Sequence, residues 1–249
     1  AQEMRFEGQE LASHQGCAGL RSRPFVDLIP RRQNQSRPMR YLAVLFTAVS
    51  LHASLVHAAD LLPRVLLYTR NGLTLEGKKG YVHDNIPNSI VAIRALGAEH
   101  GFAVDVSENP GDFVLANLRQ YRALVFSNTN NQIFDTEEQK RALQDYVRGG
   151  GGVAGIHSAC GSMRSWPWFW SLIGGSFAWH PKLQEFTVRV VDRRHPSTRF
   201  LGETWRVTDE FYFLRDMPPG LKVLLQGDHS TIVDPRKPKD ETSRPLAWY

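Results

Sequence analysis

The chain has 249 residues, of which 42% are hydrophobic and 22% charged, with a formal net charge of +5 at neutral pH. This is the composition of an ordinary globular protein that can bury a full core, so one domain is the simplest expectation. Beyond residue 59 the charges nearly balance, with 23 basic and 21 acidic residues. The basic character therefore gives no argument for nucleic-acid binding.

Residues 39–58 begin with Met and one Arg, continue as an apolar run and end in small residues. This layout is typical of a secretory signal peptide. We therefore expect residues 1–38 to be an upstream, disordered segment absent from the mature protein, which would be periplasmic or secreted without a stable membrane span. A buried core helix and an uncleaved membrane anchor are the alternatives for the apolar run. Cleavage would also remove Cys17 and leave Cys160 without a disulfide partner.

From residue 64 onward, short strand-like runs alternate with longer helical ones. The runs expected to form strands are 64–70, 102–108, 123–128 and 152–156, and the helical ones are 86–101, 113–121 and 135–150. Alternation of strand and helix implies right-handed crossovers and a parallel sheet, which makes the fold class α/β.

The run 135–150 has the clearest helix signals. Asp135 is expected to cap it, and Gly149 to end it. The residues expected on its buried face are Ala142, Leu143, Tyr146 and Val147.

After Trp179 the pattern changes to strand-like stretches without intervening helices, at 185–192, 204–214 and 222–228. We expect this half to extend the sheet in antiparallel fashion or to form a small β subregion against it. The last stretch, 244–249, has the pattern of a strand that is only starting. We therefore expect a domain over residues 64–249 that is truncated at its C-terminus.

Four glycines at 149–152 precede the strand-like run 152–156. They come before the strand, and no G-x-G-x-x-G or G-K-[ST] accompanies them, so they predict a helix stop and a turn, not a phosphate-binding loop. At the other end of the strand, "GIHSA" sets His157 between small residues. That pattern is typical of a nucleophile elbow, with His157 at its apex. A histidine simply bonded in a loop is the alternative. Cys160, three residues further on, is expected to be a small buried residue.

Several stretches together resemble the trehalose-utilisation (ThuA-like) family, a branch of the class I glutamine amidotransferase-like superfamily. They are "YTRNG", "YVHDNIPNSI", "LVFSNTN", "GGGGVAGIHSA", "WPWFWSLIGGSFAWHP", "DRRHPSTRFLGETWRVTDEFYFL" and "RPLAWY". The resemblance implies a flavodoxin-like three-layer sandwich with a central, mostly parallel sheet. It also implies carbohydrate metabolism. His157 stands where amidotransferases have a cysteine, so glutamine hydrolysis through a thiolate is not expected.

The polar positions that this resemblance carries over lie beyond strand ends, where ligands bind in α/β sheets. Those implied to be catalytic are His83, His157, His180 and Glu210. Those implied to contact substrate are Asp84, Asn128, Thr129, Asp209 and Tyr212. Trp166 and Trp179 are further candidates for substrate contact, because aromatic faces at a cleft bind sugar rings, although such residues more often belong to the core. His195 belongs to a turn motif, and we weigh a structural role for it equally.

Three functions remain open at this point. The first is a carbohydrate-active enzyme that moves protons on a disaccharide, for example beside a 3-keto group. The second is a non-catalytic carbohydrate-binding module with the same cleft. The third is a zinc-dependent hydrolase or isomerase, because His83, His157, His180 and Glu210 are the residue types of a catalytic zinc site. The expected partner is a small-molecule carbohydrate, and a homo-oligomer stays open.

Overall fold

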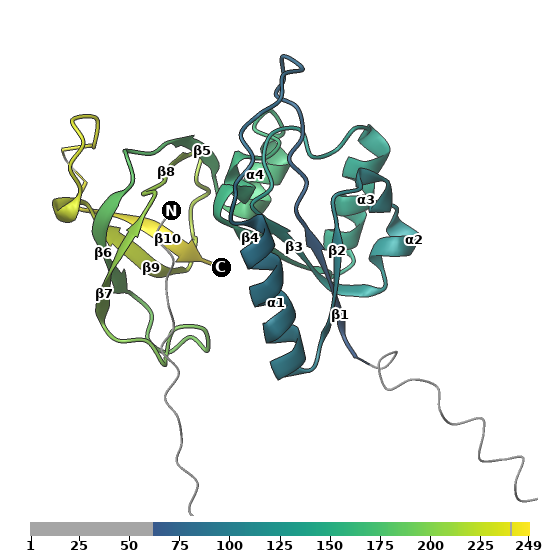
Figure 1. Ribbon diagram of the computed structural model, residues 1–249, viewed down its shortest axis with the longest axis horizontal. Helices are drawn as coiled ribbons and strands as arrows, with labels where there is room; N and C mark the ends of the chain where they lie inside the picture. The colour runs from purple at the N-terminus through teal and green to yellow at the C-terminus, as the bar shows by residue number, and fades with distance from the viewer. Residues whose placement is uncertain (1–61, 240) are drawn as a thin grey trace, which may run out of the picture. The chain divides into compact units, whose positions relative to one another are not determined.

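A computed structural model describes residues 62–239 and 241–249 (Figure 1). The expected signal peptide at 39–58 and the upstream segment 1–38 lie outside the described residues. Within the described part of the chain, no helix combines the length and the apolar character needed to cross a membrane.

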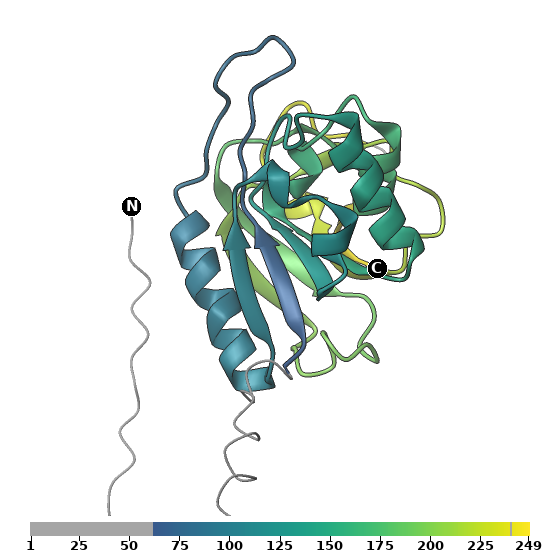
Figure 2. The same ribbon diagram turned by 90° about the vertical axis from the view of Figure 1, so that its right-hand side faces the viewer.

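The first half forms a parallel four-stranded sheet with the strand order β2-β1-β3-β4. Its strands are β1 (Arg64–Tyr68), β2 (Ala103–Ser107), β3 (Tyr121–Ser127) and β4 (Gly152–Ile156). Helix α1 (Ile86–His100) covers one face, and α2 (Leu115–Leu118) and α3 (Glu137–Arg148) cover the other (Figure 2). The predicted three-layer α/β arrangement is confirmed, and the strand order is that of flavodoxin-like sheets.

An aromatic cluster fills the space between this sheet and its helices. Tyr68 is fully buried, and its ring contacts Phe113 edge-on at 4.7 Å between centroids. Its hydroxyl donates a 2.8 Å hydrogen bond to the backbone carbonyl of Ile133. Phe126 and Phe169 complete the cluster with another edge-on contact at 5.4 Å. Burying each such side chain contributes about 1.5–3 kcal/mol, so this cluster fixes the sheet against α3 and the segments beside it.

Helix α3 begins one residue later than predicted. Thr136, not Asp135, is the N-cap, and its backbone is extended. Its hydroxyl accepts a hydrogen bond from the backbone N–H of Gln139, and the Gln139 side-chain oxygen accepts one from the backbone N–H of Thr136. Asp135 instead pairs with Arg70 at 2.7 Å. A Thr with Gln three residues later forms a capping box, which satisfies two helix N–H groups where Asp135 alone could satisfy one.

The buried face and the end of α3 agree with the prediction except at Val147. Ala142, Leu143 and Tyr146 are buried, whereas Val147 is half-buried. The helix ends at Gly149 as expected, and Gly150 takes the left-handed turn with φ at 90°.

The second half is antiparallel, as expected. Strands β6 (Gln184–Val190), β7 (Thr204–Asp209), β9 (Val223–Asp228) and β10 (Ser243–Trp248) form a sheet with the order β10-β9-β6-β7. Two short strands, β5 (Ser176–Trp179) and β8 (Phe213–Arg215), form a separate pair. The predicted single strand at 204–214 is therefore interrupted between β7 and β8.

Shorter helical elements complete the described chain. They are helix α4 (Pro167–Ile173) and the 3₁₀ turns η2 (Pro110–Asp112), η3 (His157–Gly161) and η4 (His229–Thr231). Trp248 of β10 donates a 3.0 Å hydrogen bond to the carbonyl of Ile173 at the end of α4. Gly174 follows with φ at 101°, and a Cβ there would lie 2.0 Å from the Trp248 indole nitrogen. Only glycine allows this contact between β10 and the first half of the domain.

Asp228 anchors the antiparallel sheet at the end of β9. Its carboxylate accepts from the Ser230 hydroxyl and backbone, and from the Nε of Arg189 on β6 at 3.2 Å. The hydrogen bond from Ser230, followed by those from Arg189, lowers the pKa of Asp228 to about 2.

We expect Asp228→Asn to lower the free energy of unfolding at pH 7 by about 1–3 kcal/mol, because it removes a charge-assisted network. A depressed carboxyl pKa stabilises the fold above the unfolded pKa, so the difference from wild type should shrink as pH falls from about 4 to about 2. Urea titrations across this range measure it. Asp145→Asn, which removes an exposed pair with Arg148, is the control and should cost less than about 0.5 kcal/mol. A pH-independent effect at Asp228 would contradict this account.

Candidate functional site

His157 occupies a sharp turn directly after β4, as the sequence predicted. It is the first residue of η3, and its φ of 54° lies in the left-handed region. The next four residues are small and buried. At Gly155 an added Cβ would lie only 3.2 Å from the Ala159 side chain. Small neighbours thus let the chain turn tightly and present the His157 imidazole beyond the sheet edge.

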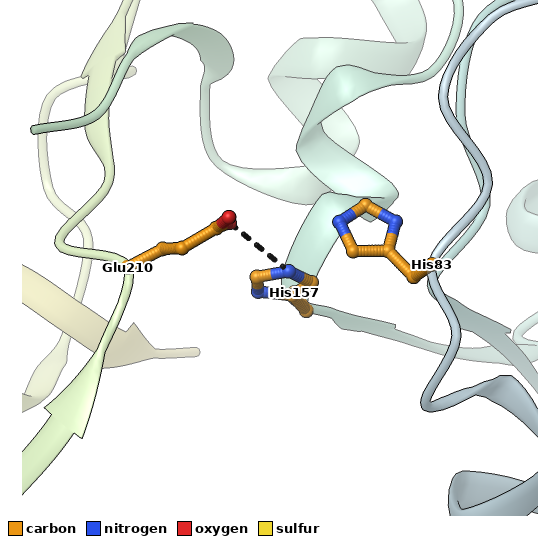
Figure 3. Close-up of side chains that lie close together, drawn as sticks. All are labelled: His83, His157 and Glu210. Carbon is orange, nitrogen blue, oxygen red and sulfur yellow. Dashed lines mark ion pairs between the residues drawn. The ribbon is translucent and has the colours of Figure 1, made fainter. Parts of the chain in front are cut away.

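Four of the predicted residues come together around this turn, and Figure 3 shows three of them, His83, His157 and Glu210. His83 follows β1, and its ring centroid lies 4.6 Å from that of His157. Glu210 comes from the segment between β7 and β8, and its Oε2 lies 3.5 Å from the His157 Nε2. The other Glu210 oxygen lies 3.7 Å from the Nε2 of His180. We call His83, His157 and Glu210, whose ligand atoms all lie within 4.8 Å of one another, the triad.

Tyr212 is the nearest hydrogen-bonding neighbour of His157, with its hydroxyl 3.1 Å from Nε2. Burial, followed by the negative charge of Glu210, raises the pKa of Tyr212, so the phenol stays protonated at neutral pH. The hydroxyl can donate to Nε2 or accept from it, depending on which ring nitrogen of His157 carries the proton. This contact joins residues 55 positions apart in the sequence.

The two imidazoles of the triad are neutral at physiological pH. Burial is the main cause that lowers the pKa of His157, against the opposing charge of Glu210. Burial also lowers the pKa of His83, and the neighbouring His157 lowers it further. In the carboxylate, Glu210 Oε2 is buried and makes no hydrogen bond within the described residues. The site thus presents lone pairs that can accept a proton or bind a cation.

Sequence analysis missed Ser158, which follows the apex of the turn. It is buried, and its hydroxyl lies 3.2 Å from the Nδ1 of His83. A small hydroxyl residue directly after the elbow is the only local signal for it. This contact orients the His83 ring toward the turn.

The predicted substrate contacts Asp84 and Asp209 border the triad. Asp84 is exposed beside His83, and Asp209 accepts a 2.8 Å hydrogen bond from the Glu210 backbone. Asn128 and Thr129 lie beneath the turn and are at most 1% exposed. The Asn128 N–H donates to the carbonyl of Ile156, and the Thr129 hydroxyl accepts from Ser162. These two support the turn from below, and contact with substrate stays a prediction for all four.

Trp166 and Trp179 each pack against other aromatic side chains. Trp166 stacks on Trp168 at 5.1 Å and packs against the parallel-sheet core. Trp179 stacks on Phe213 at 4.1 Å, and Arg236 lies 4.2 Å from its ring centroid. Both pack as core aromatics, and sugar binding by either stays a prediction.

A cavity of about 880 Å³ opens beside the triad. Its polar end is lined by His157, Glu210 and Tyr212, and it continues along β4. The antiparallel sheet contributes apolar side chains such as Trp205 and Trp248. A volume in this range suits a small-molecule ligand. His195 also lines the cavity, with its ring 4.7 Å from that of Tyr249.

Comparison with known proteins agrees with this fold. A protein described as ThuA-like from Bacteroides uniformis superposes with a TM-score of 0.55 at 22% identity, covering 75% of each chain. A second, from Parabacteroides merdae, gives a TM-score of 0.52 at 21% identity, covering 67% of this chain and 68% of the other. A search of curated proteins found no match.

The sequence profile of the ThuA family, described as trehalose utilisation, matches residues 71–249. This match includes the elbow, the triad and every described helix and strand except β1. The chain is therefore a member of the ThuA (trehalose utilisation) family.

Proposed function

We propose that the protein acts on a disaccharide of the trehalose type, or on its 3-keto derivative, and that the chemistry takes place at the triad. The observation that carries this proposal is the convergence of two neutral imidazoles and a carboxylate within 4.8 Å at the end of a cavity of ligand size. The family description, trehalose utilisation, supports a carbohydrate substrate.

The side chains suit proton transfer beside a ketone. A C–H bond next to a carbonyl can lose its proton because the electron pair that remains is delocalised as an enolate. The imidazole of His157, whose pKa is lowered by burial, takes the proton. The Tyr212 hydroxyl is a donor for the developing enolate oxygen, since it stays protonated at neutral pH. Such acid–base assistance is worth about 10²–10⁴ in rate.

We expect His157→Asn to lower turnover of 3-keto-trehalose by about 10²–10⁴-fold, because it removes an imidazole from the reactive centre. Asparagine tolerates the left-handed backbone, so the fold should remain intact. Product formation by chromatography and mass spectrometry measures turnover, and circular dichroism checks folding.

His100→Asn, at an exposed histidine ending α1, is the matched control and should keep wild-type turnover. Full activity in His157→Asn would make His157 a structural turn residue. Sugar binding by calorimetry without turnover in any form of the protein would identify a carbohydrate-binding module instead.

Cys160 does not supply an amidotransferase-type nucleophile. It is 6% exposed, and its thiol donates to the backbone carbonyl of His157 at 3.3 Å. Burial raises the pKa of this thiol to about 12. The reactive thiolate is therefore essentially absent at neutral pH.

We expect iodoacetamide at pH 8 to alkylate Cys160 at least about 100-fold more slowly in the folded protein than in urea. Folding shields the sulfur from the reagent and lowers the fraction of the thiol that is ionised to thiolate. Peptide mapping by mass spectrometry separates its modification from that of Cys17. Equal rates in both conditions would show an accessible, reactive thiol.

We also propose that the protein is exported, on the basis of the signal-like run at 39–58. Expression with its own N-terminus in a Gram-negative host should give a periplasmic product that begins near Ala59. Mass spectrometry of the exported protein determines this end, and residues before Met39 in it would contradict the cleavage.

A further inference from the structure

We infer that the triad is a binding site for one divalent first-row transition ion, with His83, His157 and Glu210 as its three protein ligands. The inference uses the site of the proposed function and deepens it, but metal binding can be tested with no sugar present.

The spacing of the three side chains suits a single ion. Ligand atoms bound to zinc at about 2.0–2.1 Å in tetrahedral geometry lie roughly 3.4 Å apart. His157 Nε2 and Glu210 Oε2 are already separated by 3.5 Å. The widest separation within the triad is 4.8 Å or less, so small side-chain adjustments would bring all three ligand atoms onto one ion.

The Glu210 carboxylate gives an independent indication. Its Oε2 is buried and has no hydrogen-bond partner among the described residues. A buried carboxylate oxygen that accepts no hydrogen bond is costly, and ion coordination removes that cost. The other carboxylate oxygen, Oε1, lies 3.7 Å from the Nε2 of His180. Oε2 therefore faces the triad, and Oε1 faces His180.

The donor set selects the class of metal. Calcium and magnesium prefer oxygen ligands, whereas two imidazoles with one carboxylate suit zinc or iron(II). Three protein ligands leave an open coordination position, as in catalytic sites. The cavity beside His157 and Glu210 supplies space for a water molecule or a sugar oxygen there.

Neighbouring residues suit this arrangement. Ser158 contacts the His83 Nδ1 at 3.2 Å, which leaves the other ring nitrogen for a metal. The Tyr212 hydroxyl lies on the His157 Nε2 at 3.1 Å, so an ion there would replace this one hydrogen bond. In the metal-bound form His83 and His157 are ligands, and proton transfer falls to His180 and Tyr212.

The test uses the full chain without an affinity tag, stripped with chelator and dialysed. Isothermal titration with zinc chloride should show one site per chain, and plasma mass spectrometry should find one zinc per chain after removal of excess metal. X-ray absorption should give metal–ligand distances of about 2.0–2.1 Å with imidazole scattering.

Glu210→Gln and His83→Asn should each weaken zinc binding by at least about 10–100-fold, since mutating even a residue that only hydrogen-bonds to a metal ligand lowers metal affinity by that factor. Tyr212→Phe should bind at least as tightly as wild type, because it removes the competing hydrogen bond. His100→Asn controls for surface histidines and should bind normally. Circular dichroism checks that each variant is folded.

Absence of stoichiometric binding in the wild type, or equal affinity in Glu210→Gln and His83→Asn, would overturn the inference. Normal zinc binding without sugar turnover would leave the metal site standing and refute the proposed reaction. Turnover by metal-free protein, together with no zinc binding, would support the proposed reaction and refute the metal site.

Discussion

The left-handed backbone at His157 is the constraint on which the site depends. A non-glycine residue in this conformation costs on the order of 1–3 kcal/mol and persists only where the surrounding structure enforces it. Asn128 at the end of β3 has φ at 52°, and its N–H donates to the carbonyl of Ile156. Two adjacent strands thus end in left-handed residues that support each other. From this turn the imidazole of His157 reaches the cavity.

The site also needs both halves of the domain. His83 and His157 follow strands of the parallel sheet, whereas His180, Glu210 and Tyr212 come from the antiparallel half. The Trp248–Ile173 hydrogen bond and the close approach at Gly174 join the two halves on the described chain. The 3.5 Å separation of His157 and Glu210 is therefore a property of tertiary packing and not of either sheet alone.

Local patterns predicted the order of strands and helices because apolar periodicity is a local property. The elbow at His157 was also predictable, since small residues on both sides of one polar residue are a local signal. The cap of α3 was wrong by one residue because the Thr136–Gln139 capping box, itself a local pattern, satisfies more backbone groups than Asp135 could. The break between β7 and β8, the contact of Tyr212 with His157 and the cavity wall at Trp205 depend on pairing between distant segments, which no short window contains.

Strand β4 has a further consequence through its outer edge. Among the described residues it pairs only with β3, and Ala154, Gly155 and Ile156 are exposed. The unpaired N–H and C=O groups of such an edge are a template for an incoming strand. Because Val153 to Gly155 also line the cavity, an added strand would occupy the space beside His157. A strand bound at this edge would therefore block the approach to His157.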